Sequence, residues 1–329
     1  MKIPSRLPRH TAVFLLLFPL SQAGSLQAQL GVEAARQASL QSAPSLSLPD
    51  QGAGEVVPPS VTVPRMEGDA EYGVQKILYR RSNIEPFNVA FDLGYYYTDN
   101  VALVPDGEQD DSFFRSGLRA SYTPQLKGGL FFSTSAGSEV YRYTDSDLFD
   151  FDLLSFDIGL LYTTPQQGTI FDPIFGNMVG YLRYGYYSLS EPWEWSDSTF
   201  ENQSIIAGLL KTWKISRGHQ VYAGVNADWS IDASQPLPQR DEYSAFLGYR
   251  VKWTADLESN VLYRAALNEY KEIDRSDVNQ ILSLGLTYYF NDWVSATGSI
   301  SAVFNNSDRA AFDYNALNGG ISVALQAKW

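Results

Sequence analysis

The sequence contains no cysteine and only two histidines, and each shortage removes classes of protein. Without cysteine there are no disulfides, no thiolate nucleophile, no cysteine-ligated metal and no lipidated cysteine. Histidine is the side chain that most often serves as a general base near neutral pH, and it is a common zinc ligand. We therefore expect no enzyme activity, no cofactor and no metal site.

Long apolar runs are also missing. The longest, at 11–20 (TAVFLLLFPL), is about half the roughly 20 residues that a transmembrane helix needs. Lys2, Arg6 and Arg9 precede this run, and small residues around Ala23 and Ala28 follow it. This order is typical of a secretory signal peptide, which we assign to 1–28.

Positive charge is scarce as well, since 24 Lys and Arg stand against 37 Asp and Glu, giving a net charge of −13. A chain of this balance repels phosphate backbones, so we expect no nucleic-acid partner. Residues 29–85 are rich in Gln, Ala, Ser and Pro. Such a segment cannot bury enough apolar surface to fold, and we expect a disordered periplasmic arm, with a plug in the lumen as the alternative role.

From residue 86 to 329 the composition becomes aromatic and aliphatic, and the period becomes two. Phe87, Phe91 and Tyr95, for example, alternate with small or polar residues, as in a β-strand with one apolar face. Each such segment has the length of a tilted membrane strand. The segments are 87–98, 112–123, 129–143, 151–163, 177–188, 201–213, 220–230, 241–253, 258–270, 278–290, 293–305 and 316–329.

These segments predict an all-β fold: a closed, antiparallel, up-and-down transmembrane β-barrel of about 12 strands in the outer membrane. Short links alternate with longer acidic ones, as expected for periplasmic turns and external loops. The link at 164–176 is a longer exception. Aromatic residues also recur at both ends of the apolar rows, as at Tyr97 and Trp229 on one side and Tyr162 and Trp329 on the other. An exported β-sandwich or β-helix, the alternative fold, has no reason to make two such bands.

Charges on the opposite face of each strand should line the barrel interior, because a charge facing lipid at the midplane costs about 2–4 kcal/mol. The pore-lining candidates are Asp92, Arg115, Arg119, Glu139, Asp157, Arg183, Asp228, Arg250, Lys252 and Arg264, together with Asn226 and Asn268. Such an interior forms either an ion-pair network that blocks flow or a narrow channel with a slight anion bias. Arg142 does not fit the register of its segment.

Two further groups of residues could carry chemistry. His219 falls in a short turn on the periplasmic side, away from any external site, and we interpret it as solvated. The acidic groups 106–111 and 145–152 could hold calcium or bridge to lipopolysaccharide, but their spacing matches no calcium loop. We favour plain solvated loops.

Three stretches resemble a known family: EPFNVAFDLGYYYTDNVALVP, RDEYSAFLGYR and FDYNALNGGISVALQAKW. They are similar to the uncharacterised β-barrel porins of Gram-negative outer membranes, some of them associated with exopolysaccharide export, over about residues 85–329. The last stretch also resembles the C-terminal signal read by the barrel-assembly machinery, although it ends in Trp329 instead of Phe and has Ala327 where an aromatic is usual. The resemblance implies fold and location more than activity.

The sequence thus predicts a small porin-like channel for hydrophilic solutes, in contact with outer-membrane lipid and lipopolysaccharide. The alternative is a non-conducting structural or exopolysaccharide-export accessory barrel that binds an envelope partner through its arm or acidic loops.

Overall fold

The computed structural model describes residues 85–164 and 176–329. The predicted signal peptide, nearly all of the predicted arm and most of the link at 164–176 lie outside the described residues. Within the two described ranges, no helix is long and apolar enough to cross a membrane.

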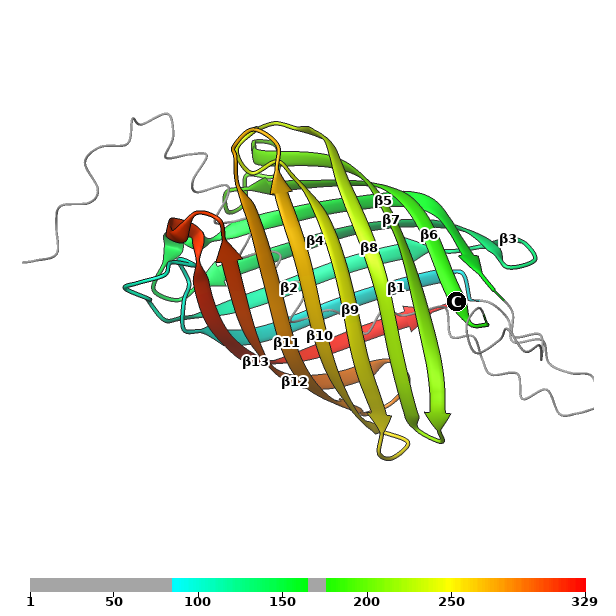
Figure 1. Cartoon of the computed structure of the whole chain (residues 1–329). Coiled ribbons are helices and arrows are strands. Elements are labelled where there is room, and N and C mark those ends of the chain that lie inside the picture. Colours follow the sequence, from blue (N-terminus) through cyan, green and yellow to red (C-terminus); the bar gives the residue numbers. More distant parts are fainter. Residues whose placement is uncertain (1–84, 165–175) are drawn as a thin grey trace, which may run out of the picture.

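Twelve long strands and one short strand make up most of the described chain (Figure 1). They are β1 (Phe87–Thr98), β2 (Asp111–Tyr122), β3 (Gln125–Lys127), β4 (Leu130–Tyr143), β5 (Phe151–Thr163), β6 (Met178–Ser190), β7 (Ser198–Ser216), β8 (His219–Ala233), β9 (Arg240–Lys252), β10 (Leu257–Tyr270), β11 (Ser276–Tyr289), β12 (Val294–Ser307) and β13 (Tyr314–Lys328). Two 3₁₀ turns, η2 (Asp147–Phe149) and η3 (Ala310–Phe312), lie in the connections.

Hydrogen bonds close the sheet into a barrel. Neighbouring long strands pair antiparallel, β2 pairs directly with β4, and β1 pairs with both β2 and β13. At the seam, the backbone N–H of Phe87 donates to the carbonyl of Trp329 at 3.0 Å, and the N–H of Trp329 donates back at 3.1 Å. The predicted closed antiparallel barrel of about 12 strands is confirmed. Only β3, a short extension paired with β4, was not predicted.

Alternation along each strand separates an outer from an inner face. In β11, Leu282, Leu284 and Leu286 are each about half exposed on the outer face, while Ser283 and Gly285 lie on the inner face. Hydrocarbon offers no hydrogen bonds, so an extended chain can cross it only if its neighbours pair every backbone group. The apolar outer face and the closed ladder satisfy that condition together.

Two aromatic bands encircle the outer face. Tyr95, Tyr97, Trp229, Tyr243 and Phe304 are exposed toward the ends of their strands that carry the longer connections. Exposed aromatics at the opposite ends are Tyr162, Trp253, Tyr288, Phe290 and Trp329, to which the structure adds Trp293. Aromatic rings prefer the two membrane interfaces, so the bands mark where the barrel crosses the lipid boundary.

The two ends of the barrel differ in their connections. At the loop end lie 99–110, 144–150, 191–197, 234–239, 271–275 and 308–313, whereas the turn end carries the short links 217–218, 253–256 and 290–293. Phe87 and Trp329 also lie at the turn end. In outer-membrane barrels the short turns face the periplasm, which orients this barrel with its longer loops outside.

Candidate functional site: the barrel lumen

All of the predicted pore-lining side chains lie on the inner face by the alternation of their strands, and cross-strand pairing brings the inner rows of neighbouring strands side by side. Asp92 on β1 lies opposite Gly117, two residues from Arg115 and Arg119 on β2. Glu139, Asp157 and Arg183 continue the inner rows on β4, β5 and β6. The remaining predicted residues, Asn226, Asp228, Arg250, Lys252, Arg264 and Asn268, line β8, β9 and β10.

One wall of the lumen carries a buried ion-pair network centred on Arg115. Its guanidinium bonds to the carboxylate of Asp92, and its Nη2 lies 3.1 Å from Oε2 of Glu139. Arg119 reaches the second oxygen of Glu139 at 3.3 Å. The hydroxyl of Tyr141 donates to Glu139 at 2.6 Å and accepts from Nε of Arg115 at 3.0 Å. Every charge in this buried group therefore has an opposite charge beside it, as burial requires.

The facing wall pairs its arginines as well. Arg264 bonds to Glu242 on the neighbouring strand, and Nε of Arg250 lies 3.2 Å from Glu258. Sequence reasoning omitted both glutamates, although each has the inward parity of its own segment. Of the six predicted basic residues, only Arg183 and Lys252 form no ion pair within the described ranges. This pairing weakens the anion bias that the sequence suggested.

The lumen changes character along its length. Toward the loop end, inward side chains such as Asn268, Asn279 and Asn318 are at most 4% exposed. Toward the turn end, inward side chains are partly exposed, and the side chain of Arg119 is 50% exposed although its partner Glu139 is only 5% exposed. The accessible part of the inner wall therefore lies in the turn half.

Apolar side chains account for much of the burial in the loop half, and the sequence interpretation missed them. Tyr96, Phe113, Tyr141, Phe151 and Phe200 form one buried cluster across β1 to β7. The alternation in the sequence assigns Tyr96 to a face of small and polar residues. The run of three tyrosines at 95–97 could have shown this. Because side chains alternate between the two faces of a strand, at least one of the three rings must lie on the inner face of the barrel.

The first connection, 99–110, folds into this loop half. Val101 joins the cluster around Tyr96, while Leu103 packs with Ile281 and Val303 on the inner faces of β11 and β12. Leu103 adopts a positive φ of 52°, which a branched side chain rarely takes. Across the seam, β12 and β11 are two and three strands from β1, so the loop turns inward over this part of the wall and occupies part of the barrel mouth.

Asn100 fixes this loop in place. Its side chain is fully buried, and its Nδ2 donates to the carbonyls of Val104 at 2.8 Å and Asn315 at 2.9 Å. Its Oδ1 accepts from the backbone N–H of Val104 at 3.1 Å. The amide of Asn100 thus supplies hydrogen-bond partners to buried backbone groups that would otherwise lack them.

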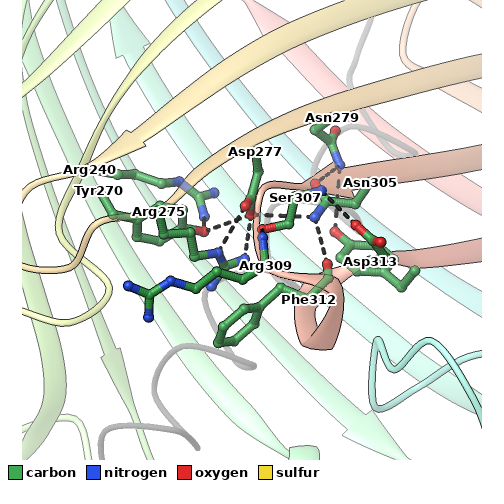
Figure 2. Close-up of polar contacts among 11 residues, drawn as sticks. Arg240, Tyr270, Arg275, Asp277, Asn279, Asn305, Ser307, Arg309, Phe312 and Asp313 are labelled. Carbon is green, nitrogen blue, oxygen red and sulfur yellow. Dashed lines mark hydrogen bonds and ion pairs between the residues drawn. The ribbon is translucent and has the colours of Figure 1, made fainter.

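A second polar cluster fixes the connections beside β11 and β12 (Figure 2). Arg275 donates through Nε and Nη2 to the carboxylate of Asp277, and its guanidinium lies 3.6 Å from the ring centroid of Phe312. The ring centroid of Tyr270 lies 4.3 Å from the same guanidinium. Asn305 donates to the carbonyl of Phe312 at 2.9 Å. These contacts hold η3 against the barrel wall.

The residues outside the lumen have simpler roles. Arg142 lies on the outer face at the loop end, where it pairs with Asp152 at 2.6 Å and covers the ring of Trp193 at 4.9 Å. His219 begins β8 at the turn end, and its Nδ1 lies 2.7 Å from the hydroxyl of Tyr249. His219 is therefore a hydrogen-bonded strand residue, and our interpretation of it as a solvated turn residue was wrong. Its side chain lies far from the loop end.

The acidic groups in the loops are only partly solvated. Asp152 is fully buried and accepts from the backbone N–H of Trp193 at 2.8 Å, and Asp111 is 3% exposed. Asp106, Glu108 and Asp110 are exposed. In the part of the chain that the structure describes, no group of three or more His, Cys, Asp or Glu is arranged to hold a metal.

The fold and this polar, ion-paired interior define a β-barrel of the outer-membrane class. No family profile and no curated protein sequence matches the chain. Among solved structures, the COG4313 outer membrane channel from Pseudomonas putida F1 is similar, with a TM-score of 0.54 and 9% identity, covering 77% of this chain and 100% of that one.

Two further similar structures are less well superimposed. The outer membrane phospholipase A from Escherichia coli has a TM-score of 0.43 and 13% identity, covering 72% of this chain and 92% of that one. The KdgM porin has a TM-score of 0.38 and 10% identity, covering 72% and 98%. The likeness to the COG4313 channel supports the barrel fold alone, because the identity is 9%. The two weaker matches carry no argument.

Proposed function

We propose that this chain is an outer-membrane channel through which small hydrophilic solutes diffuse. The observation that supports this most directly is the accessible, polar inner wall of the turn half. Polar side chains facing the inside of a membrane barrel are either filler or pore lining. Arg119 keeps half of its side-chain surface exposed, so this part of the lumen is not filled by side-chain packing.

The pairing of charges argues for weak ion selectivity. Arg115, Arg250 and Arg264 each have a carboxylate beside them, so they add little net field along the lumen. Arg183, Lys252 and the exposed part of Arg119 remain to favour anions. We expect a small preference for anions that depends on these three residues.

Single-channel conductance of the refolded mature chain in a planar bilayer tests the channel. Discrete current steps are expected, and Arg119→Ala together with Arg183→Ala should reduce the anion preference. Lys127→Ala, a change at an exposed residue of the short strand β3, is the matched control. A correctly folded barrel that gives no steps, either as the full mature chain or without residues 29–85, would reject the channel.

A second candidate, an accessory barrel that binds an envelope or polysaccharide-export partner, is favoured by the buried loop half. The inward fold of 99–110 and the cluster around Arg275 narrow that end. Deleting residues 29–85 separates the two functions, since lost partner association with unchanged conductance would favour the accessory role.

We further propose that the barrel is not an enzyme. His219, the single histidine of the described residues, lies at the turn end beside the outward-facing Tyr249, away from the charged lumen. Hydrolysis by a barrel enzyme would need a base beside a nucleophile. His219→Ala should leave any phospholipid hydrolysis by the purified protein at background.

A further inference from the structure

One arrangement of three residues occurs twice on the inner wall between β6 and β10. Tyr181 on β6 leans across Gly208 on β7, and its hydroxyl donates to Oδ1 of Asn226 on β8 at 3.0 Å. The same arrangement recurs two strands further round the barrel. There, Tyr222 on β8 leans across Gly248 on β9 and donates to Asn260 on β10 at 2.8 Å.

The glycines show how closely the rings follow the wall. A Cβ atom at Gly208 would lie 2.4 Å from Cζ of Tyr181, and one at Gly248 would lie 2.0 Å from Cζ of Tyr222. A third ring, that of Phe246 on β9, covers Gly224 on β8 in the same way, with a hypothetical Cβ 2.5 Å from its Cζ. The far ends of these three rings therefore lie against the barrel wall, and the planes of Tyr222 and Phe246 are inclined by 54° to each other.

These rings belong to the accessible turn half. Tyr181, Tyr222 and Phe246 are each partly exposed, whereas the inward rings of the cluster around Tyr96 in the loop half are buried. Each tethering asparagine uses its amide oxygen for the tyrosine, which leaves its amide N–H groups as donors. Arg183, whose guanidinium lies 4.9 Å from the ring of Tyr181, forms no ion pair within the described ranges.

The wall beyond β10 has different but matching chemistry. β11, β12 and β13 continue the sheet from β10 to the seam, and in the turn half their inner faces carry several small hydroxyl side chains. They are Ser283, Thr287, Ser295, Thr297, Ser299 and Ser322. The hydroxyls of Thr287 and Thr297 lie 3.0 Å apart, so they share a single hydrogen bond and keep further donor or acceptor capacity.

We propose that this turn-half lumen binds uncharged saccharides, with the two Tyr–Gly–Asn units and Phe246 as the platform. The face of a sugar ring presents C–H groups, which suit the electron-rich face of an aromatic ring. Its hydroxyls both donate and accept, as the amides of Asn226 and Asn260 and the serine wall require. Rings already held against the wall lose little freedom on binding.

Charge pairing supports an uncharged ligand. Two arginines near the platform are accompanied by carboxylates, Arg250 by Glu258 and Arg264 by Glu242, whereas Arg183 contacts the ring of Tyr181. A charged solute would compete with these existing pairs, whereas a neutral polyhydroxylated one gains hydrogen bonds without disturbing them. This inference extends the proposed lumen pathway by naming the class of solute.

Calorimetric titration of the folded mature chain in detergent micelles with maltohexaose tests the site. The double variant Tyr181→Leu, Tyr222→Leu should bind at least about tenfold more weakly, since stacked aromatic contacts each contribute on the order of 1 kcal/mol. Tyr289→Leu removes an inward tyrosine of the turn half outside the platform and should bind as the unchanged chain does. If the double variant does not fold, Phe246→Leu replaces it, with a smaller expected loss.

Three results would overturn the proposal: no binding of maltohexaose by the unchanged chain, equal binding by the platform variant, or binding of an oligosaccharide of uronic acids alone. Calorimetry does not require conduction, so the two proposals can fail separately. Saccharide binding by a barrel that gives no current steps would reject the channel and keep this site. Current steps without saccharide binding would keep the channel and reject the saccharide site.

Discussion

Single residues in the lumen differ mainly in whether their polar groups are buried. Glu139 is 4% exposed and holds Arg115, Arg119 and the hydroxyl of Tyr141 together. Arg119 is half exposed at the edge of the same network. The contribution of a charge to stability should follow this difference, because water can replace a partner only where it has access.

Glu139→Gln should therefore destabilise the barrel far more than Arg119→Gln. Removing the Glu139 charge leaves the buried Arg115 with Asp92 alone, and breaking a buried pair costs about 3–5 kcal/mol. The change at Arg119 should cost about 1 kcal/mol or less. Urea unfolding in lipid vesicles, followed by tryptophan fluorescence, measures both, and equal losses would contradict the role given to burial.

The glycines beneath the rings allow a second test at this scale. Gly248→Ala would place a methyl group 2.0 Å from the ring of Tyr222, so the ring must leave the wall, at a cost of about 1–3 kcal/mol. Gly285, another inward glycine, has open space within 4 Å of the point where an added Cβ would lie, and Gly285→Ala should change stability by less than about 0.5 kcal/mol. Similar unfolding midpoints for the two variants would show that the ring is not held there.

Among the elements, the first loop and the last strand have the clearest separate roles. The loop at 99–110 reaches across the inner faces of β11 to β13 through Leu103, whereas β13 completes the barrel by pairing with β1. The first loop should set the width of the loop-end mouth. The last strand, β13, should decide whether the barrel closes.

Leu103→Asp should release the first loop, since a carboxylate cannot be buried among Ile281, Val303 and Tyr314 without a partner. Release widens the mouth, so channel conductance should rise severalfold. Asp106→Asn, at an exposed position of the same loop, is the control and should leave conductance unchanged. An unaltered conductance in Leu103→Asp would show that this loop is not the constriction.

Trp329→Ala should lower the yield of barrel assembled in the outer membrane. Trp329 stacks on Phe87 with centroids 5.7 Å apart, and the two residues exchange backbone hydrogen bonds at the seam. Trp253→Ala removes another exposed tryptophan at the turn end, between β9 and β10 and away from the seam. If fractionation finds both variants assembled equally well, the terminal aromatic is not part of an assembly signal.

At the scale of the whole molecule, the barrel presents an apolar outer face and a polar inner face to two different surroundings. Leu284 and Ser283 are neighbours in β11 on opposite faces. Leu284→Arg should cost about 2–4 kcal/mol when the barrel is folded into lipid, because the charge faces hydrocarbon near the midplane. Ser283→Arg, facing the lumen, should cost much less, and equal costs in vesicle unfolding would contradict the membrane orientation.

The period of two in the sequence determines the two-faced architecture of the barrel. Parity alone assigns each residue to the outer or inner face, so the sequence was enough to place Asp92, Arg183 and Arg264 inside the barrel. The aromatic bands and the alternation of short and long connections follow from the same local pattern. Strand ends were predicted within a few residues for the same reason.

Only the closed structure decided which inward residues meet. Register and closure choose the partners, so parity could place Arg264 inside but could not pair it with Glu242. The Tyr–Gly–Asn units each cross three strands, and the first loop contacts strands far along the chain. Such contacts depend on how each strand is shifted against the next, a quantity that no local pattern in the sequence contains.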